Sequence, residues 1–284
     1  MREIIQIDDN FYIRATSSLI DTRTQILMAG DTFAIFDRHG DIQPLRQAQG
    51  LYHEGTRFVS LFAITIGGEQ PLLLNSSMRR DNRHLSVDLT NPDLRLGGEN
   101  QLVRHELVHL YRDKFVWEGG YCERIRISNY ASESLILPLE VQFGADFADI
   151  FEVRGTPRGR RGTVLPTKLE ASQAIIDYQG THGKIRRARF SFDPRPDEIR
   201  EHRAVWRFRL SPRETRSLHI RVYCTYNGGV DPIGVGDCQN AFKTLLSADK
   251  EFRAGGAEIW TDNERFNQWI ERSWADLQML IALT

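Results

Sequence analysis

The chain has 284 residues, enough for one large domain or two ordinary ones. Its 37 basic and 38 acidic residues leave a formal charge of -1, which excludes the broad positive field that would attract nucleic acid or an anionic membrane surface. The sequence therefore predicts no nucleic-acid partner and no membrane partner, and a neutral or locally recognised ligand fits better.

The three cysteines, Cys122, Cys224 and Cys238, lie far apart and lack CxxC spacing, so we predict reduced thiols and no cysteine-based metal site. Residues 1–9 contain acids where a signal peptide needs an uninterrupted apolar stretch. No later segment is long and apolar enough to cross a bilayer. These features predict a cytoplasmic protein.

Residues 11–226 form a succession of short β-branched and aromatic runs separated by turn residues. Apolar and basic residues alternate over 206–210, which is typical of a strand with one buried face. A glycine pair, Gly67 and Gly68, predicts a hairpin between residues 58–66 and 71–74. Further strands are expected at 33–36, 85–89, 102–111, 123–128, 135–143, 174–178, 185–192, 204–210 and 218–224. The pattern predicts a mainly β fold, a large antiparallel β-sandwich of two sheets packed face to face.

The pattern changes after residue 228, where a glycine-rich stretch leads to a predicted helix over 237–253. A second helix is predicted from Asn263 to the C-terminus, with one apolar stripe formed by Phe266, Trp269, Ile270, Trp274, Leu277, Leu280 and Ile281. The stripe either packs back on the sandwich or begins a helical domain, and the lack of a stop signal before Thr284 favours the second. We predict a sandwich domain over 1–228, then a linker and helices over 229–284.

Residues 105–109 match the H-E-x-x-H zinc pattern. That pattern binds zinc when a helix places both histidines on one face. The residues around His105 and His109 are rich in β formers, and in a strand the two side chains would stand about 13 Å apart. We therefore predict no metal site here, and a zinc hydrolase remains a competing hypothesis that metal analysis would test.

The densest acidic group near aromatic residues is Asp146, Asp149 and Glu152. A glycosidase needs two carboxyl groups roughly 5 to 10 Å apart. If this stretch is extended, Asp146 and Glu152 stand about 20 Å apart, so they cannot form that pair unaided. The alternative is a loop whose acids pair with Arg154 and other arginines. The basic clusters at 158–161 and 184–189 predict a solvated face or ion pairs.

Residues 144–155, GADFADIFEVRG, resemble the hallmark segment in the N-terminal domain of bacterial glycogen debranching enzymes of the amylo-α-1,6-glucosidase type. Residues 50–58, GLYHEGTRF, are similar to that family's first motif, and 72–74 and 89–92 follow in the expected order. Residues 266–267 and 272–280 resemble the entry into the family's catalytic domain. The family commonly has an aspartate where this chain has Gly55, which puts the role of that acid in doubt and leaves Arg57 and His53 as candidates.

The resemblance implies a β-supersandwich followed by an (α/α)6 barrel that hydrolyses α-1,6 branch linkages in glycogen-like α-glucans. The general acid and base would belong to the barrel, so we expect no catalytic residue, no metal and no cofactor in this chain, and no activity from it alone. Its implied role is to brace its own C-terminal catalytic barrel and to shape the substrate cleft, with candidate residues Asp146, Asp149, Glu152, Arg154, Arg57 and His53. A free-standing carbohydrate-binding or scaffolding β-sandwich is the alternative.

Overall fold

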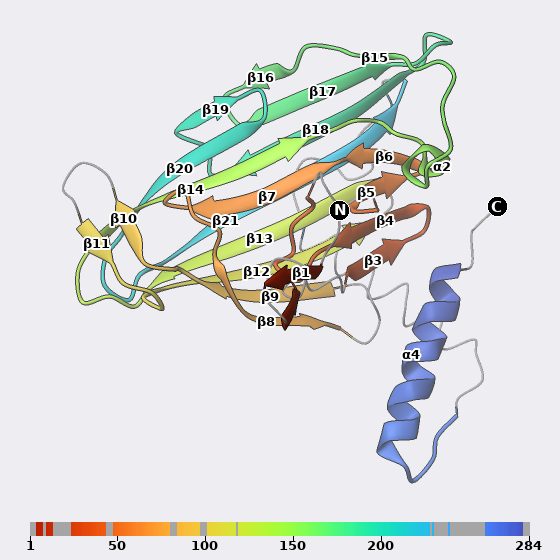
Figure 1. Cartoon of the computed structure of the whole chain (residues 1–284). Coiled ribbons are helices and arrows are strands. Elements are labelled where there is room, and N and C mark those ends of the chain that lie inside the picture. Colours follow the sequence, from red (N-terminus) through yellow and green to blue (C-terminus); the bar gives the residue numbers. More distant parts are fainter. Residues whose placement is uncertain are drawn as a thin grey trace.

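The fold is built almost entirely from antiparallel strands (Figure 1). The computed structural model describes residues 4–7, 10–13, 24–43, 48–79, 84–96, 101–117, 119–227, 229, 238 and 259–280. Within them the chain forms a nine-stranded sheet, two four-stranded sheets and two two-stranded sheets. The predicted mainly β, antiparallel fold is confirmed.

The nine-stranded sheet, here the large sheet, has the order β15-β17-β18-β21-β13-β12-β9-β8, with β16 also paired to β17. Its strands are β8 (Leu72–Met78), β9 (His84–Thr90), β12 (Val108–Trp117), β13 (Gly120–Asn129), β15 (Thr163–Val164), β16 (Lys168–Glu170), β17 (Gln173–Gln179), β18 (Ile185–Asp193) and β21 (Thr215–Tyr226). β21 comes last in the sequence of these strands, yet it lies inside the sheet between β18 and β13.

Two four-stranded sheets form the opposing layer (Figure 1). One has the order β19-β20-β14-β7 and consists of β7 (Leu61–Ile66), β14 (Leu135–Gly144), β19 (Glu198–Arg200) and β20 (Arg203–Leu210). The other consists of β3 (Gln25–Ala29), β4 (Thr32–Phe36), β5 (Gly50–His53) and β6 (Thr56–Val59). Two short pairs complete the strands, namely β1 (Ile4–Ile7) with β2 (Asn10–Ile13) and β10 (Leu94–Leu96) with β11 (Gln101–Val103).

One connected apolar core lies between the layers. Val108 and Leu110 of β12 point inward, as do Ile125 and Ile127 of β13, and all four are fully buried. Alternation places the intervening side chains on the outer face of the large sheet, which is more polar. Each such aliphatic side chain contributes about 1.5 to 3 kcal/mol relative to an exposed position.

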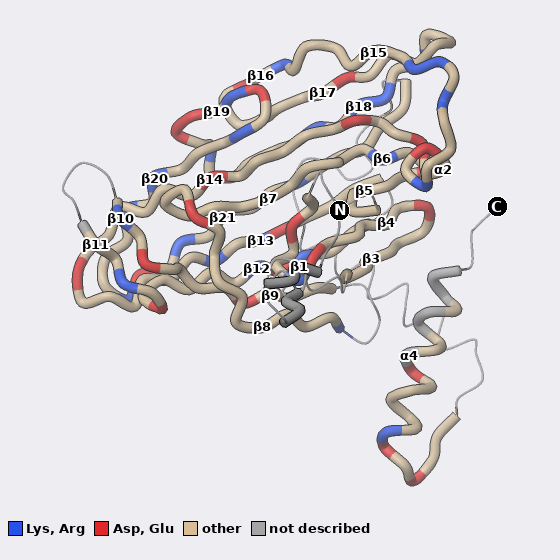
Figure 2. The backbone as a smooth tube through the Cα atoms, viewed as in Figure 1, with Lys and Arg blue, Asp and Glu red and all other residues tan. Residues whose placement is uncertain are grey.

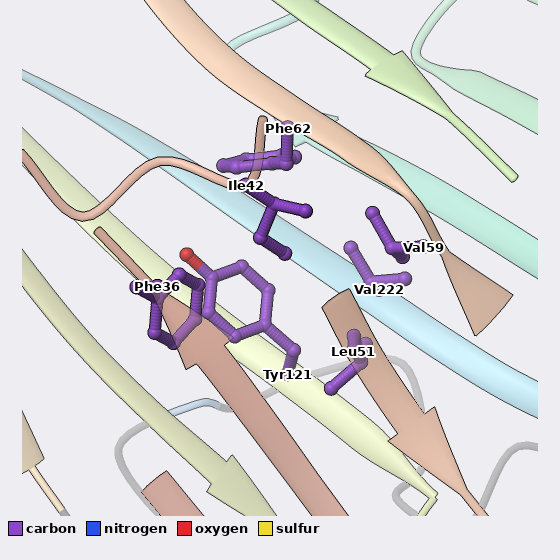
Figure 3. Close-up of a pocket in the computed structure, with 7 residues that line it drawn as sticks. All are labelled: Phe36, Ile42, Leu51, Val59, Phe62, Tyr121 and Val222. Carbon is purple, nitrogen blue, oxygen red and sulfur yellow. The ribbon is translucent and has the colours of Figure 1, made fainter. Parts of the chain in front are cut away.

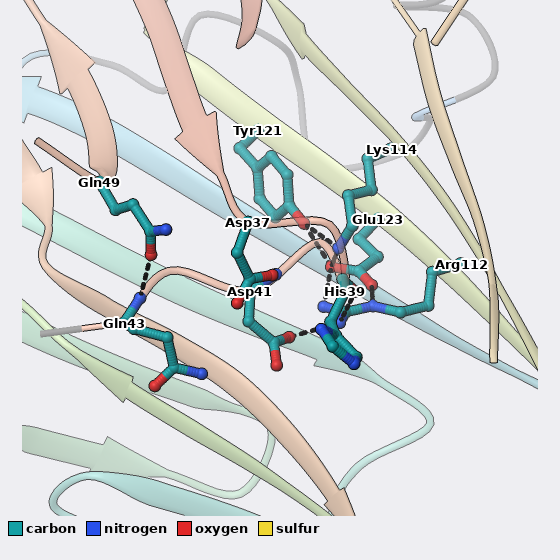
Figure 4. Close-up of polar contacts among 9 residues, drawn as sticks. All are labelled: Asp37, His39, Asp41, Gln43, Gln49, Arg112, Lys114, Tyr121 and Glu123. Carbon is teal, nitrogen blue, oxygen red and sulfur yellow. Dashed lines mark hydrogen bonds and ion pairs between the residues drawn. The ribbon is translucent and has the colours of Figure 1, made fainter. Parts of the chain in front are cut away.

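A group of charged side chains interrupts this core (Figure 4). Arg112 and Lys114 of β12 and Glu123 of β13 are fully buried. Arg112 Nε donates to Glu123 Oε1 at 2.6 Å, and Lys114 Nζ lies 2.7 Å from Glu123 Oε2. Arg112 also donates to the carboxylate of Asp41 and, at 2.7 Å, to the carbonyl oxygen of His39. Because residues 39 and 41 lie between β4 and β5, this network joins the large sheet to the sheet that carries β5 and β6.

Burial and mutual charge set the protonation of this network. Burial and the positive charge of Arg112 lower the pKa of Lys114 to about 7, and burial raises the pKa of Asp41 to about 6. Burial alone would raise the pKa of Glu123, but Arg112 and Lys114 lower it to about 2. Glu123 is therefore ionised at neutral pH and contacts both basic side chains.

The interior beside the network is closely packed (Figure 3). The ring of Tyr121 lines a small apolar pocket, and its hydroxyl donates to Glu123. The pocket holds no space for a water molecule, and its lining side chains are Phe36, Ile42, Leu51, Val59, Phe62, Tyr121 and Val222. This part of the core is a packing contact and offers no room for a ligand.

The predicted hairpin around Gly67 and Gly68 is wrong in one respect. Both glycines have positive φ, 57° and 87°, and hydrogen bonds between Ile66 and Glu69 close a tight turn. Beyond the turn, however, β7 pairs with β14, whereas β8 pairs with β9 in the large sheet. The turn therefore carries the chain from one layer to the other.

The single strand predicted over 102–111 is also wrong. It is divided into β11 and β12 by a turn in which Glu106 has a φ of 63°. The amide of Asn91 fixes this turn, because its Oδ1 accepts from the backbone N–H groups of Leu107 and Val108 at 3.0 and 2.7 Å. A side chain outside the segment thus determines the break.

The prediction that all cysteines are reduced is wrong as well. Cys122 on β13 forms a disulfide with Cys238, with Cα atoms 6.2 Å apart, while Cys224 is free and buried. The two bonded residues are separated by 116 positions, so their spacing in the sequence carried no sign of the contact.

The second C-terminal helix is confirmed as α4 (Glu264–Leu280), and Oδ1 of Asn263 accepts from the N–H of Phe266 at 3.2 Å. Figure 1 shows α4 standing clear of the sheets, and Phe266, Trp269 and Leu277 are exposed. The helix predicted over 237–253 lies outside the described residues apart from Cys238. In the part of the chain that is described, no helix has the length and apolar character needed to cross a bilayer.

Candidate functional site

The two segments that carry the sequence motifs meet at one end of the sandwich (Figure 1). The N–H of Arg57 on β6 donates to the carbonyl oxygen of Ala148 at 2.8 Å, and the N–H of Ile150 donates to that of Gly55 at 2.9 Å. The loop 144–149 leads here into the short helix α2 (Ile150–Val153). We call the surface formed by residues 52–57 and 145–155 the α2 edge.

Arg57 and Asp146 hold the two segments together. Nε of Arg57 donates to Oδ1 of Asp146 at 3.1 Å, its Nη2 donates to Oδ2, and its Nη1 donates to the carbonyl oxygen of Gln49 at 3.3 Å. Burial disfavours the charged form of Arg57 and by itself would lower the pKa of its guanidinium. The hydrogen bond to Asp146 outweighs this effect, and the pKa lies above the ordinary value. Arg57 and Asp146 thus form an ion pair that joins the two segments of the α2 edge, and we call this pair the clamp.

The stretch 146–152 is not extended, which corrects the geometry assumed from the sequence. Asp149 caps α2, because its Oδ1 accepts from the N–H of Phe151 at 2.9 Å. The helical turn places Phe151 at the surface with 63% of its area exposed. Asp149 therefore has a local structural role and orients an aromatic ring toward solvent.

Glu152 and Arg154 are further charged residues of the α2 edge. Figure 2 shows acidic and basic positions close together around α2. Oε1 of Glu152 forms an ion pair with Arg161, and its Oε2 lies 3.8 Å from Nη1 of Arg158. Oε2 is buried and accepts no hydrogen bond from the described residues. Arg154 ends α2 through its backbone N–H, and its side chain is exposed.

His53 lies at the inner side of the α2 edge and is buried. Its Nδ1 is 2.9 Å from Oγ1 of Thr32, and its ring packs against Phe58 and Tyr226 with centroids 6.2 and 5.9 Å apart. Its Nε2 lies 3.8 Å from Oε1 of Glu54. His53 therefore belongs to the packing beneath the surface, and Glu54 is the exposed group next to it.

The backbone conformation at Gly55 explains why glycine suits this position of the motif. Glu54 and Gly55 form the two-residue turn between β5 and β6, with φ values of 44° and 72°. Positive φ at both central positions is the mark of a type I′ hairpin turn, which favours glycine at the second position. The residue that departs from the family pattern is thus suited to the turn that presents Thr56 and Arg57.

Sequence reasoning missed the aromatic group that supports the α2 edge from below. Phe147 stacks on Tyr178 with centroids 5.3 Å apart, and Phe58 packs edge-on against both Phe147 and Tyr226. The guanidinium of Arg186 lies 5.8 and 5.7 Å from the rings of Tyr178 and Tyr226. Tyr178, Arg186 and Tyr226 come from β17, β18 and β21, so no local spacing around the motifs could have revealed them.

The histidines of the H-E-x-x-H match point to different carboxylates. His105 lies in the turn before β12, with Nδ1 2.9 Å from Oδ1 of Asp93. His109 lies on β12, with Nε2 3.1 Å from Oδ1 of Asp88. Among the described residues no group of three or more His, Cys, Asp or Glu side chains is arranged to hold a metal ion.

The α2 edge offers hydrogen-bonding groups and one exposed ring, and two of its carboxyl groups are held in ion pairs. Asp146 is ion-paired with Arg57, and Glu152 with Arg161. Phe151 and Arg154 face solvent beside them. Such a surface suits the binding of a polar, uncharged molecule or of a protein domain.

No curated protein matches the sequence. A solved structure named "Putative kojibiose phosphorylase from human microbiome" has 8% identity and a TM-score of 0.49 over 88% of this chain, which spans 35% of that one. A galactose mutarotase-like protein from Lactobacillus casei has 8% identity and a TM-score of 0.39 over 72% of this chain and 100% of its own. Likenesses this weak carry no argument about function.

The family match is far more specific, because it covers most of the described sandwich. The model of the N-terminal domain of some glycogen debranching enzymes matches residues 27–221. That range runs from β3 into β21 and includes both segments of the α2 edge. The chain therefore belongs to the family of N-terminal domains of glycogen debranching enzymes.

Proposed function

We propose that this chain is the non-catalytic N-terminal domain of a glycogen-debranching-type α-1,6-glucosidase, a glycoside hydrolase that acts on glycogen-like α-glucans. In this proposal it braces the enzyme's own C-terminal catalytic barrel and contributes one wall of the substrate cleft. The domain works in the cytoplasm and needs no cofactor. Membership of the family supports the parent enzyme, and the α2 edge supports the role at the cleft.

The observation that carries the role at the cleft is the arrangement of α2. An α-glucan presents hydroxyl groups and apolar sugar faces together, so it suits a surface with both polar groups and an aromatic ring. Phe151 is exposed and Arg154 beside it supplies donors, while Glu152 is ion-paired with Arg161 and holds that neighbouring loop against α2. Arg57 and Asp146 position this surface from below and do not contact the glucan.

The exposed apolar face of α4 supports the proposed domain division. Trp269 and Leu277 are 69% and 56% exposed, although an amphipathic helix normally buries such residues. We assign residues 1–228 to the sandwich and 229–284 to a linker and helices that lead into an (α/α)6 barrel. In this assignment the barrel covers the apolar face of α4.

The test uses the enzyme encoded by the native gene and the 284-residue chain side by side. The chain alone is expected to leave branched α-glucan intact, whereas the full-length enzyme cleaves it. In the full-length enzyme, Phe151→Ala and Arg154→Met should raise KM for branched glucan several-fold with an unchanged Tm, because both side chains are exposed. Arg126→Met, on the exposed outer face of β13, is the matched control and should change neither value.

Two results would overturn the proposal. One is a native reading frame that continues into something other than a helical domain, and the other is cleavage of glucan by the chain alone. Phe151 also allows a second function, a free-standing carbohydrate-binding sandwich, because exposed aromatic rings are common sugar platforms. Calorimetric titration of the chain with maltooligosaccharides separates the two, since saturable binding without a barrel supports the second function.

A further inference from the structure

We propose that the start of α4 carries a second carbohydrate site, in which an uncharged hexose unit stacks on Trp260 and is held by polar side chains of the helix. This site lies apart from the α2 edge, in the segment that follows the sandwich. The choice of an α-glucan as the ligand rests on the function proposed above, whereas the shape and chemistry of the site do not.

The first observation is a hollow beside the N-terminal part of α4. Its volume is about 350 Å³, within the range of about 300 to 1,000 Å³ that is common for small-molecule sites. One wall is the segment 260–262, and the other is the helix face formed by Glu264, Asn267, Gln268 and Glu271. One short stretch of chain thus forms the whole hollow, which we call the α4 pocket.

Hydrogen bonds between the two walls fix the shape of the α4 pocket. Oδ1 of Asn267 accepts from the backbone N–H and the side-chain hydroxyl of Thr261 at 2.9 and 2.8 Å. Nδ2 of Asn267 donates to the carbonyl oxygen of Thr261 at 2.7 Å. These contacts hold the backbone of Thr261 on the helix and thereby place Trp260 beside the helix face. Because the pocket is formed before a ligand binds, binding has a lower entropic cost.

The ring of Trp260 is the apolar surface of the α4 pocket. Trp260 is 83% exposed, more than any other large apolar residue in the described part of the chain. A hexose ring has C–H groups on its face and hydroxyl groups around its edge. An indole therefore covers the face of the sugar, while the edge stays available for hydrogen bonds.

The polar side chains of the α4 pocket suit the edge of such a ring. Nε2 of Gln268 donates to Oε1 of Glu264 at 3.2 Å, which leaves the other oxygen of each side chain as an acceptor for sugar hydroxyls. Asp262 and Glu271 add two further carboxylates. Among the described residues these acids form no group that could hold a metal ion. No basic residue is among the described residues that line the pocket, so an anionic sugar is disfavoured.

The α4 pocket lies on the polar face of its helix. Glu264, Gln268 and Glu271 follow one another at spacings of four and three positions, which places them on one face. Trp269 and Leu277 lie on the opposite face, which the catalytic barrel covers in the proposal above. A domain that packs on the apolar face therefore leaves the pocket open. A glucan chain bound there is tethered to the enzyme, which raises its effective concentration at the cleft.

Nuclear magnetic resonance of the intact 284-residue chain tests the site directly. Each tryptophan gives one indole N–H signal, and the signal of Trp260 is the one that disappears in Trp260→Phe. Titration with maltotriose should shift this signal along a saturable curve with a Kd in the millimolar range. Trp269 is the internal control, because it lies on the same helix, is 69% exposed and faces away from the pocket. Equal shifts of both signals, or no shift of the Trp260 signal, would overturn the proposal.

Matched variants separate the α4 pocket from the α2 edge in calorimetric titrations with maltotriose. Trp260→Ala should lower the affinity about tenfold, and Gln268→Ala should lower it several-fold, both with an unchanged Tm. Trp269→Ala and Phe151→Ala should leave the affinity unchanged. Binding that survives Trp260→Ala and is lost in Phe151→Ala lies at the α2 edge, and this result would contradict a site on α4.

Two small probes test the kind of ligand. Glucose 1-phosphate should shift the Trp260 signal less than glucose does at equal concentration and ionic strength, because the carboxylates repel its phosphate. Argininamide carries the opposite charge, and a larger response to it than to glucose would refute the assignment to a sugar. Failure of the function proposed above is seen elsewhere, in the native reading frame or in cleavage of glucan by the chain alone, and neither result involves Trp260.

Discussion

Nε of Arg57 on β6 lies 3.1 Å from Oδ1 of Asp146 in the loop before α2, and a second contact joins Nη2 to Oδ2. This pair connects two segments that lie far apart in the sequence and that both carry family motifs. The side chain of Arg57 is 13% exposed, so the pair is largely shielded from water. The pair adds a side-chain contact to the two backbone hydrogen bonds that hold this loop and α2 at the end of the sandwich.

Replacement of Asp146 by asparagine should destabilise the sandwich by about 1 to 3 kcal/mol, because the largely buried guanidinium of Arg57 loses its anion. The free energy of unfolding in urea measures this loss. Glu201→Gln is the matched control, since that side chain is 66% exposed, and a change within about 0.5 kcal/mol is expected. Equal effects of the two substitutions would show that the clamp contributes nothing.

Arg112→Met should be far more damaging, because it leaves Glu123 and Asp41 without their shared cation in the interior. Breaking a buried ion network by removing one member typically costs about 3 to 5 kcal/mol. Arg126→Met removes the same charge from the outer face of the next strand and should cost less than about 1 kcal/mol. Thermal unfolding of both variants checks the difference, and similar Tm values would contradict it.

The pKa of Glu123 predicts a specific loss of stability in acid. Its pKa is about 2 in the folded protein, against an ordinary value of 4.5. As the pH falls below 4.5 the unfolded chain takes up this proton first, so the stabilisation present above pH 4.5 is lost toward pH 2. The loss is about 3 kcal/mol at most. Urea unfolding between pH 5 and pH 2 should show a steeper decline for the wild type than for Glu123→Gln, and parallel curves would refute it.

Gly55→Ala should destabilise the β5–β6 hairpin by about 1 kcal/mol, because φ is 72° and a side chain there is strained. Gly55→Asn should cost less, since asparagine tolerates this backbone region. Gly159→Ala is the control, because a Cβ at that position meets nothing within 4 Å. Unfolding free energies of the three variants provide the comparison, and an equal cost for Gly55→Ala and Gly159→Ala would contradict the strain.

The sandwich could be predicted from the sequence because its signals are local. Alternation over 206–210 depends only on adjacent residues and correctly indicated β20. The same holds for the periodicity that predicted α4. Strand partners are not local, so the turn at Gly67 and Gly68 was recognised while the pairing of β7 with β14 was not.

The candidate site could be predicted only in part, because the contacts that form it are not local in the sequence. The sequence indicated Arg57 and Asp146 as separate candidates, but their contact depends on the packing of β6 against the loop before α2. Tyr178 and Arg186 lie outside the motifs, and they are close to the site only because of the order of the strands in the large sheet. The disulfide was missed because Cys238 lies against a strand more than a hundred positions earlier.

The place of β21 in the large sheet has a consequence for how the protein is made. β13 leaves the ribosome long before β21, and β18 also precedes it, so two half-sheets exist before the strand that joins them. Until residues 215–226 emerge, the nascent chain presents two unpaired edges with apolar inner faces, which are prone to wrong pairing. Completion of the centre of the sheet is therefore a late event in synthesis, because it waits for the last of the nine strands.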